Sequence, residues 1–114
     1  MAVSELELKL IDRTVGTLCR RLSPPQLADQ LHVIYEVDGH NVCIFEERPP
    51  WRATGAWTHH GVAKFRYYRS RRQWQLHWMR RDLKWHLYEP AEATADLAAL
   101  VAVVDEDTYG AFFG

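Results

Sequence analysis

The first regular spacing of apolar residues along the chain is that of a helix. After Ser4, apolar residues are spaced three and four apart, at Leu8, Ile11, Val15, Leu18 and Leu22. This spacing places them on one face of an α-helix. Ser4 and Glu7 have the spacing of a capping box, in which each side chain bonds the other's backbone N–H. Ser23-Pro24-Pro25 ends this helix, because proline cannot continue it.

The middle of the chain changes to a period of two, which is typical of strands. Turn residues such as Asp38-Gly39-His40-Asn41 separate the alternating segments. The pattern predicts five strands, over 31–37, 42–48, 62–69, 74–80 and 84–88. The first two strands carry apolar residues on both faces, so we expect their hairpin to lie well inside the sheet.

The last three predicted strands each have one apolar side and one polar side. We expect the apolar side to face a core and the polar side to face outward. The side expected to face the core carries Ala63, Phe65, Tyr67, Trp74, Leu76, Trp78, Trp85 and Leu87.

A second helix is predicted from about Thr94 to Val104, with Leu97, Leu100 and Val101 on its buried side. The order is therefore helix, five strands, helix. A run of strands with helices at the ends, joined by hairpin-length connections, predicts an α+β fold. We expect a single domain over residues 1–114, in which one antiparallel sheet of about five strands carries both helices on one face.

Composition alone selects no function. The chain has 114 residues with a formal net charge of −1, so there is no global signal for nucleic acid or membrane. The longest apolar run, Leu97–Val104, is too short to span a bilayer. The N-terminus lacks the pattern of a signal peptide, and Cys19 and Cys43 are far apart with no CxxC motif. We expect a cytoplasmic protein with two reduced thiols.

Charge is distributed unevenly. Residues 62–88 carry eight basic side chains against Asp82 alone, whereas residues 89–114 carry six acidic side chains and none that is basic. Two interpretations remain open. The acidic segment folds back and neutralises the basic one, or the two face different partners.

Several short runs resemble a known family. They are Phe45-Glu46-Glu47-Arg48-Pro49, Ala63-Lys64-Phe65-Arg66-Tyr67, Trp74 with Trp78-Met79-Arg80, Asp82-Leu83-Lys84-Trp85-His86, Tyr88-Glu89-Pro90 and Phe112-Phe113-Gly114. Together they resemble a family of short bacterial proteins catalogued only as a domain of unknown function. The resemblance covers nearly the whole chain and implies a complete bacterial protein. It implies no activity, substrate or catalytic residue.

The polar side of the last three strands is the main candidate for binding. Cations and flat rings together suit a polyanion, since lysine and arginine neutralise phosphates and rings stack on bases. The alternative is a solvated face that only shields the strands. Our leading hypothesis is a non-enzymatic module for nucleic acid or another polyanion. Its expected binding residues are Lys64, Arg66, Tyr68, Gln75, His77, Lys84, His86 and Tyr88, extended by Arg71 and Arg72 on the adjoining turn.

An enzymatic hypothesis rests on Asp82, Lys84 and His86, which are spaced by two. An acid, a cation and an imidazole on one face suit acid–base chemistry or a metal with a phosphate. Glu46 and Arg48 would join them if their strand lay beside this one. The function would then be a metal-dependent phosphodiester hydrolase. The alternative is a salt bridge of Asp82 with Arg80 or Lys84, and no catalytic residue is assigned.

Zinc is a further alternative that the spacing does not favour. His59-His60 with His40, Cys43 or His77 are the available ligands. Adjacent histidines point to opposite sides of an extended chain, and no spacing typical of a structural zinc site appears. We expect neither a metal nor a cofactor.

The third functional hypothesis is a protein-interaction or homodimer module. Trp51 and Trp57 lie in the longest predicted loop, and Phe112-Phe113 ends the chain. Such aromatic residues either pack on the core or dock on another chain.

Overall fold

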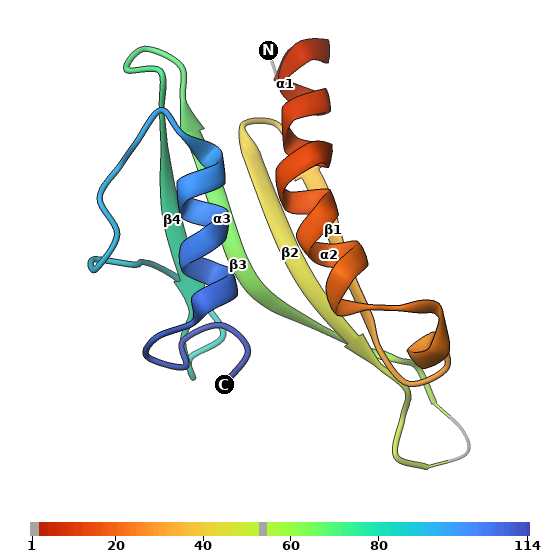
Figure 1. Cartoon of the computed structure of the whole chain (residues 1–114). Coiled ribbons are helices and arrows are strands. Elements are labelled where there is room, and N and C mark those ends of the chain that lie inside the picture. Colours follow the sequence, from red (N-terminus) through yellow and green to blue (C-terminus); the bar gives the residue numbers. More distant parts are fainter. Residues whose placement is uncertain (1–2, 53–54) are drawn as a thin grey trace.

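The computed structural model describes residues 3–52 and 55–114. Its framework is one antiparallel sheet in the order β1-β2-β3-β4-β5, in which each strand pairs with the next (Figure 1). The strands are β1 (His32–Asp38), β2 (Asn41–Arg48), β3 (Thr58–Tyr68), β4 (Gln73–Met79) and β5 (Trp85–Leu87). The predicted α+β class and single sheet are confirmed. The predicted place of the first hairpin is wrong, because β1 is an edge strand.

The N-terminal helix has three parts. These are α1 (Glu5–Ile11), a π-helical turn η1 (Asp12–Gly16) and α2 (Thr17–Leu22), followed by the short 3-10 turn η2 (Pro25–Leu27). The predicted capping box is present, with Glu7 N–H donating to Ser4 Oγ at 3.2 Å and Ser4 N–H donating to Glu7 Oε1 at 2.6 Å.

The π-helical turn changes which residues of α1 reach the core. Ile11, Val15 and Leu18 are buried as predicted, but Leu8 is 43% exposed. A π-turn adds a residue to one helical turn and so rotates the residues before it. In Figure 1 the first turns of α1 also rise beyond the β1–β2 turn. Leu8 therefore lies off the buried face.

A hydrogen-bond network fixes this turn to the sheet. Tyr35 of β1 donates its hydroxyl to Asp12 Oδ1 at 2.9 Å, and Arg20 Nη1 lies 3.0 Å from the same oxygen. A Cβ atom on Gly16 would lie only 2.7 Å from that oxygen and 3.0 Å from Arg20 Nη1. Because Gly16 has no side chain, the Asp12–Arg20 ion pair can lie directly against the helix at this position.

The C-terminal helix, α3 (Leu97–Glu106), begins later than the predicted Thr94. Thr94 forms a bridge with Trp74 instead, through backbone hydrogen bonds of 2.7 and 3.0 Å. Asp96 is the N-cap, and its Oδ1 accepts the Ala98 N–H at 3.1 Å.

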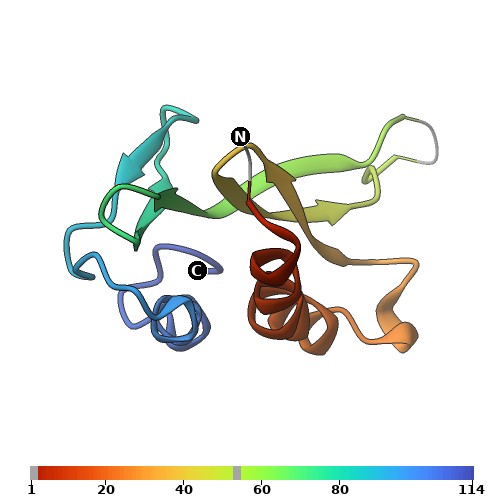
Figure 2. The ribbon, with the colours of Figure 1, turned by 90° about the horizontal axis from the view of Figure 1, so that it is seen from above.

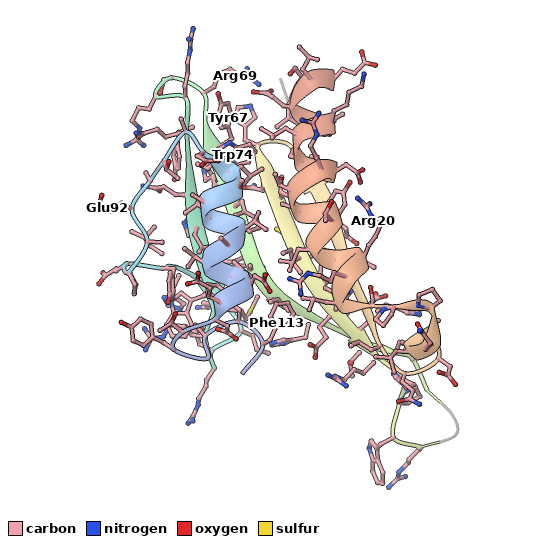
Figure 3. All side chains as sticks on the ribbon, viewed as in Figure 1. Arg20, Tyr67, Arg69, Trp74, Glu92 and Phe113 are labelled. Carbon is pink, nitrogen blue, oxygen red and sulfur yellow. The ribbon has the colours of Figure 1, made fainter. Side chains whose placement is uncertain are left out.

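Both helices cover the same face of the sheet (Figure 2), as predicted. The core between the two layers contains Ile11, Val15, Val42, Ile44, Phe65, Trp74, Leu76, Leu97 and Val104. The upper end of this layer is closed by rings (Figure 3). There Tyr67 and Trp74 have centroids 4.8 Å apart, and the Arg69 guanidinium lies 5.5 Å from the Tyr67 ring.

We predict that Gly16→Ala fails to give the gain of about 1 kcal/mol that alanine usually brings to a helix. The added Cβ would lie 2.7 Å from Asp12 Oδ1, so this exposed carboxylate has to move and its ion pair with Arg20 is weakened. Urea unfolding measures the change. In the Asp12→Ala background the same substitution should give the larger gain, because the carboxylate is absent. An equal gain in both backgrounds would contradict this account.

Candidate nucleic-acid interface

The sheet face opposite the helices is uncovered and is called the open face here (Figure 2). Directly paired residues of antiparallel strands have side chains on the same face. The register therefore forms rows across it. One row is Glu36, Cys43, Lys64, His77 and Leu87, and the next is Asp38, Asn41, Arg66 and Gln75.

The basic part of the open face lies on β3, β4 and the turn between them. We call it the basic patch, and it consists of Lys64, Arg66, Tyr68, Arg71, Arg72, Gln75 and His77. The Arg66 and Arg71 guanidinium groups lie 5.3 and 4.6 Å from the Tyr68 ring centroid. Guanidinium groups stacked in this way keep N–H donors for phosphate oxygens.

The cations of the basic patch have no carboxylate partner among the described residues. Arginines elsewhere do, since Arg20, Arg21, Arg48 and Arg69 each lie 2.6–3.1 Å from an acid. Of the acidic C-terminal segment, Asp105 pairs with Arg21 and Asp96 caps α3. Within residues 3–52 and 55–114, no ion pair joins this segment to the patch. Its charge is therefore available to a ligand.

His77 lies between two of these cations. It pairs with Lys64 across the strands, and its Nδ1 is buried without a hydrogen-bond partner in the described structure. Burial, and then the charges of Lys64 and Arg66, lower the pKa of His77 below its ordinary 6.5. The imidazole is therefore neutral at pH 7.

Carboxylates occupy the opposite edge of the open face. Glu36 and Asp38 of β1 lie in the same rows as Lys64 and Arg66, two strands away. Glu47 lies in another row, with His59 Nδ1 at 2.8 Å and His32 Nδ1 at 3.7 Å. The face is thus basic over β3 and β4 and acidic toward β1.

The predicted interface was wrong about part of β5. His86 pairs with Trp78, and Tyr88 is buried and donates its N–H to the Leu76 carbonyl at 2.9 Å. His86 and Tyr88 therefore lie on the helix side, away from the basic patch. Lys84 is exposed in the turn before β5.

Trp85 takes the opposite place from the one predicted. It pairs with Met79 and lies on the open face, where Lys64 Nζ is 6.0 Å from its ring centroid. The connection 80–84 sets this register. In it Leu83 has a φ of 61°, and its N–H donates to the Arg80 carbonyl at 2.9 Å. Pairing the predicted strands 74–80 and 84–88 outward from a three-residue turn would have placed Trp85 opposite Met79, whereas the apolar alternation predicts the other face.

Of the candidate catalytic residues, the structure brings together Asp82 and His86 but not Glu46. The ion pair of Asp82 is with His86, and not with Arg80 or Lys84 as the alternative had it. Asp82 Oδ2 lies 2.8 Å from His86 Nε2, and Asp82 Oδ1 accepts the Lys84 N–H at 3.0 Å. The hydrogen bond with His86 contributes most, and that with the Lys84 N–H contributes less, to holding the pKa of Asp82 below its ordinary 3.8. Glu46 instead pairs with Arg48 at 2.9 Å. It lies on β2, separated from β5 by β3 and β4, so the condition under which Glu46 and Arg48 would join Asp82 is not met.

The proposed zinc ligands are also dispersed. His59 pairs with Glu47 on the open face, whereas His60 pairs with Glu46 on the other face. No group of three or more His, Cys, Asp or Glu in the described part of the chain is placed to hold a metal ion. Both cysteines are free, and burial raises the pKa of Cys19 to about 11 and also raises the pKa of Cys43.

Comparison with known protein families identifies the family of this chain. A family model described as a domain of unknown function (DUF3024) matches residues 3–114. The chain belongs to the DUF3024 family. No curated protein and no solved structure matches it. None of the helices in the described residues is long and apolar enough to cross a membrane.

The aromatic residues of the third hypothesis differ in exposure in this DUF3024 chain. Trp51 is 88% exposed, whereas Trp57 stacks on His32 with centroids 4.5 Å apart. Phe112 is buried and Phe113 is half-buried. The protein-interaction or homodimer module stays a prediction.

We predict that Lys64→Gln or Arg66→Gln raises the pKa of His77, because each removes a cation that disfavours the imidazolium. NMR titration of the His77 ring measures the pKa. The folded pKa lies below that of the unfolded chain, so protonation favours unfolding, and stability should fall as pH drops below 6.5. Lys9→Gln on α1 is the control and should leave His77 unchanged. An equal shift in the control would contradict the assignment.

Proposed function

We propose that this DUF3024 protein is a non-enzymatic module that binds single-stranded nucleic acid on the basic patch. The observation that carries the proposal is that Lys64 and Arg66, two residues apart on β3, lie together on the uncovered face beside His77 and Gln75, without acidic partners among the described residues. Phosphates neutralise such cations and release the counterions condensed on the nucleic acid.

The surroundings of these cations support a nucleic acid over a simple anion. Tyr68 and Trp85 add rings to the same face, close to Arg66 and Lys64 respectively. Rings beside cations suit a single strand, whose bases are free to stack, better than a duplex, whose bases are already stacked.

The distribution of charge gives the ligand a path. Glu36 and Asp38 at the β1 edge repel phosphates, whereas Arg71 and Arg72 extend the positive charge past the β3–β4 turn. A bound strand would therefore follow the β3–β4 hairpin and would not cross the sheet to β1.

The direct test is fluorescence anisotropy with labelled oligo-dT and oligo-U at two salt concentrations. Lys64→Glu with Arg66→Glu should weaken binding by about tenfold or more and make it less salt-dependent, because two phosphate contacts are lost. Lys9→Glu with Arg13→Glu makes the same charge change on the exposed side of the N-terminal helix and should have little effect.

Two outcomes would remove the proposal. One is no binding of either oligonucleotide at low salt. The other is equal weakening in the helix variant, which would show attraction to net charge alone. Tighter binding of duplex than of single strand would keep the patch but reject the stacking argument.

Binding should also take up a proton. Phosphates next to Lys64 and Arg66 cancel the charges that disfavour His77 protonation, so the pKa of His77 rises toward its ordinary value. The groups facing His77 are these two cations on β3 and the uncharged Leu87 on β5. Affinity should therefore increase as pH falls from 8 to about 6. His77→Gln should remove most of this dependence, and an unchanged pH profile in that variant would contradict it.

A further inference from the structure

Two adjoining hollows lie between the β4–β5 hairpin and the C-terminal segment, on the helix side of the sheet. Their volumes are about 450 and 520 Å³, within the size range of small-molecule sites. Trp78, Arg80 and Ala111 line both, so we treat them as one site and call it the hairpin hollow. It faces away from the basic patch, because Trp78 and His77 are consecutive residues of one strand and point to opposite faces.

The C-terminal wall of the hairpin hollow is held in place by Asp107. Its carboxylate accepts the N–H groups of Phe112, Phe113 and Gly114 at 3.0, 2.7 and 3.1 Å. The Phe112 ring also packs on Tyr88, with centroids 5.0 Å apart. These contacts position Tyr109, Gly110 and Ala111, which line the hollow, against the hairpin.

Charged groups of both signs line the hollow, Arg80 and Arg81 on one hand and Asp82 and Glu89 on the other. The Arg80 guanidinium lies 5.6 Å from the Trp78 ring centroid, and Arg80 is exposed and has no acidic partner among the described residues. Asp82 is engaged by His86, with Asp82 Oδ2 2.8 Å from His86 Nε2, so Arg80 is left to bind an anionic group. An arginine fork binds a carboxylate or a phosphate through two parallel hydrogen bonds.

The remaining wall is aromatic. Trp78 is half-buried, Tyr88 is buried and Tyr109 is 75% exposed. Trp78 and Tyr88 meet edge to face with centroids 6.3 Å apart. Trp78, Tyr88 and Tyr109 line the same hollow, which therefore suits a flat apolar group. The charges of Asp82 and Glu89 repel an anionic group placed away from Arg80, so the hollow suits a ligand with a single anionic group bound at Arg80.

We propose that the hairpin hollow binds a small molecule that joins a flat ring to a single carboxylate or phosphate. Arg80 holds the anionic group, Trp78 and Tyr109 hold the ring, and His86 adds a hydrogen bond. The site is independent of the nucleic-acid proposal, since it uses other residues on the other side of the sheet.

The test uses isothermal titration of the full chain with matched probes. Indole-3-acetate and phenyl phosphate carry a ring and an anion, whereas indole, acetate and inorganic phosphate each carry one of the two. At least one of the first pair should bind at micromolar to millimolar concentration, and more tightly than its separate parts. Which of the two binds identifies the anionic group. Backbone NMR shifts should centre on Arg80, His86 and residues 109–111.

Variants separate this site from the open face. Arg80→Gln should weaken the bound probe by about tenfold or more, because a charge-assisted hydrogen bond is lost. Arg72→Gln, the matched change in the basic patch, should leave probe affinity unchanged. Arg80 is exposed, so Arg80→Gln should fold normally, as circular dichroism checks.

Three results would overturn the proposal. They are no binding of any probe, binding of indole or acetate as tight as that of indole-3-acetate, and probe affinity unchanged in Arg80→Gln. Each is distinguishable from failure of the nucleic-acid proposal, which is measured by oligonucleotide affinity in the Lys64 and Arg66 variant.

Discussion

The pairing register of β3 with its neighbours is the constraint on which the rest of the structure depends. It aligns Val42, Phe65 and Leu76 in one row and Ile44, Ala63 and Trp78 in the next, under the helices. All of these except Trp78 are fully or almost fully buried. A slip of one residue would exchange the two faces of a strand and place Lys64 and Arg66 in the core. The cost of burying unpaired cations is large, so the buried rows also fix which residues face outward.

The features that could be predicted from the sequence are those determined by the regular spacing of apolar residues. The N-terminal helix, the five strands and the inward side of β3 and β4 follow from spacing alone, because burial of one face selects the apolar side. The same argument failed at β5. There the strand has three residues, too few for its own pattern to decide, and the connection from Arg80 to Lys84 decides instead. A non-glycine residue with positive φ, here Leu83, is not visible as a pattern in the sequence. Likewise the π-helical turn of the N-terminal helix left Leu8 outside the core without changing the apparent spacing.

Placing Trp85 on the open face changes that face as well as the hairpin. A Cβ atom on Gly61 of β3 would lie 2.9 Å from two atoms of the Trp85 ring and 2.8 Å from the Met79 methyl group. The absence of a side chain at Gly61 therefore allows the indole to lie across β4 onto β3. The strands shift register at Ile44/Phe45, next to this contact, so that Phe45 pairs with Gly61. The open face is consequently apolar around Gly61 and basic toward the β3–β4 turn.

The two ends of β4 are therefore organised by different parts of the chain. Near its start, Trp74 is bound to Thr94 through the backbone and supports the turn that carries Arg71 and Arg72. Near its end, Trp78 contacts Tyr88, which Phe112 of the C-terminal segment covers. The Asp107 carboxylate holds that segment in place. Asp107 is itself the residue that ends α3, and its left-handed backbone conformation, with a φ of 48°, directs the carboxylate toward the segment. Asparagine would keep this shape but offer weaker hydrogen bonds, because a neutral acceptor lacks the charge that strengthens them. The hydrogen bonds to the C-terminal segment therefore explain why an acidic residue stands at position 107, without a role for it in neutralising the basic strands.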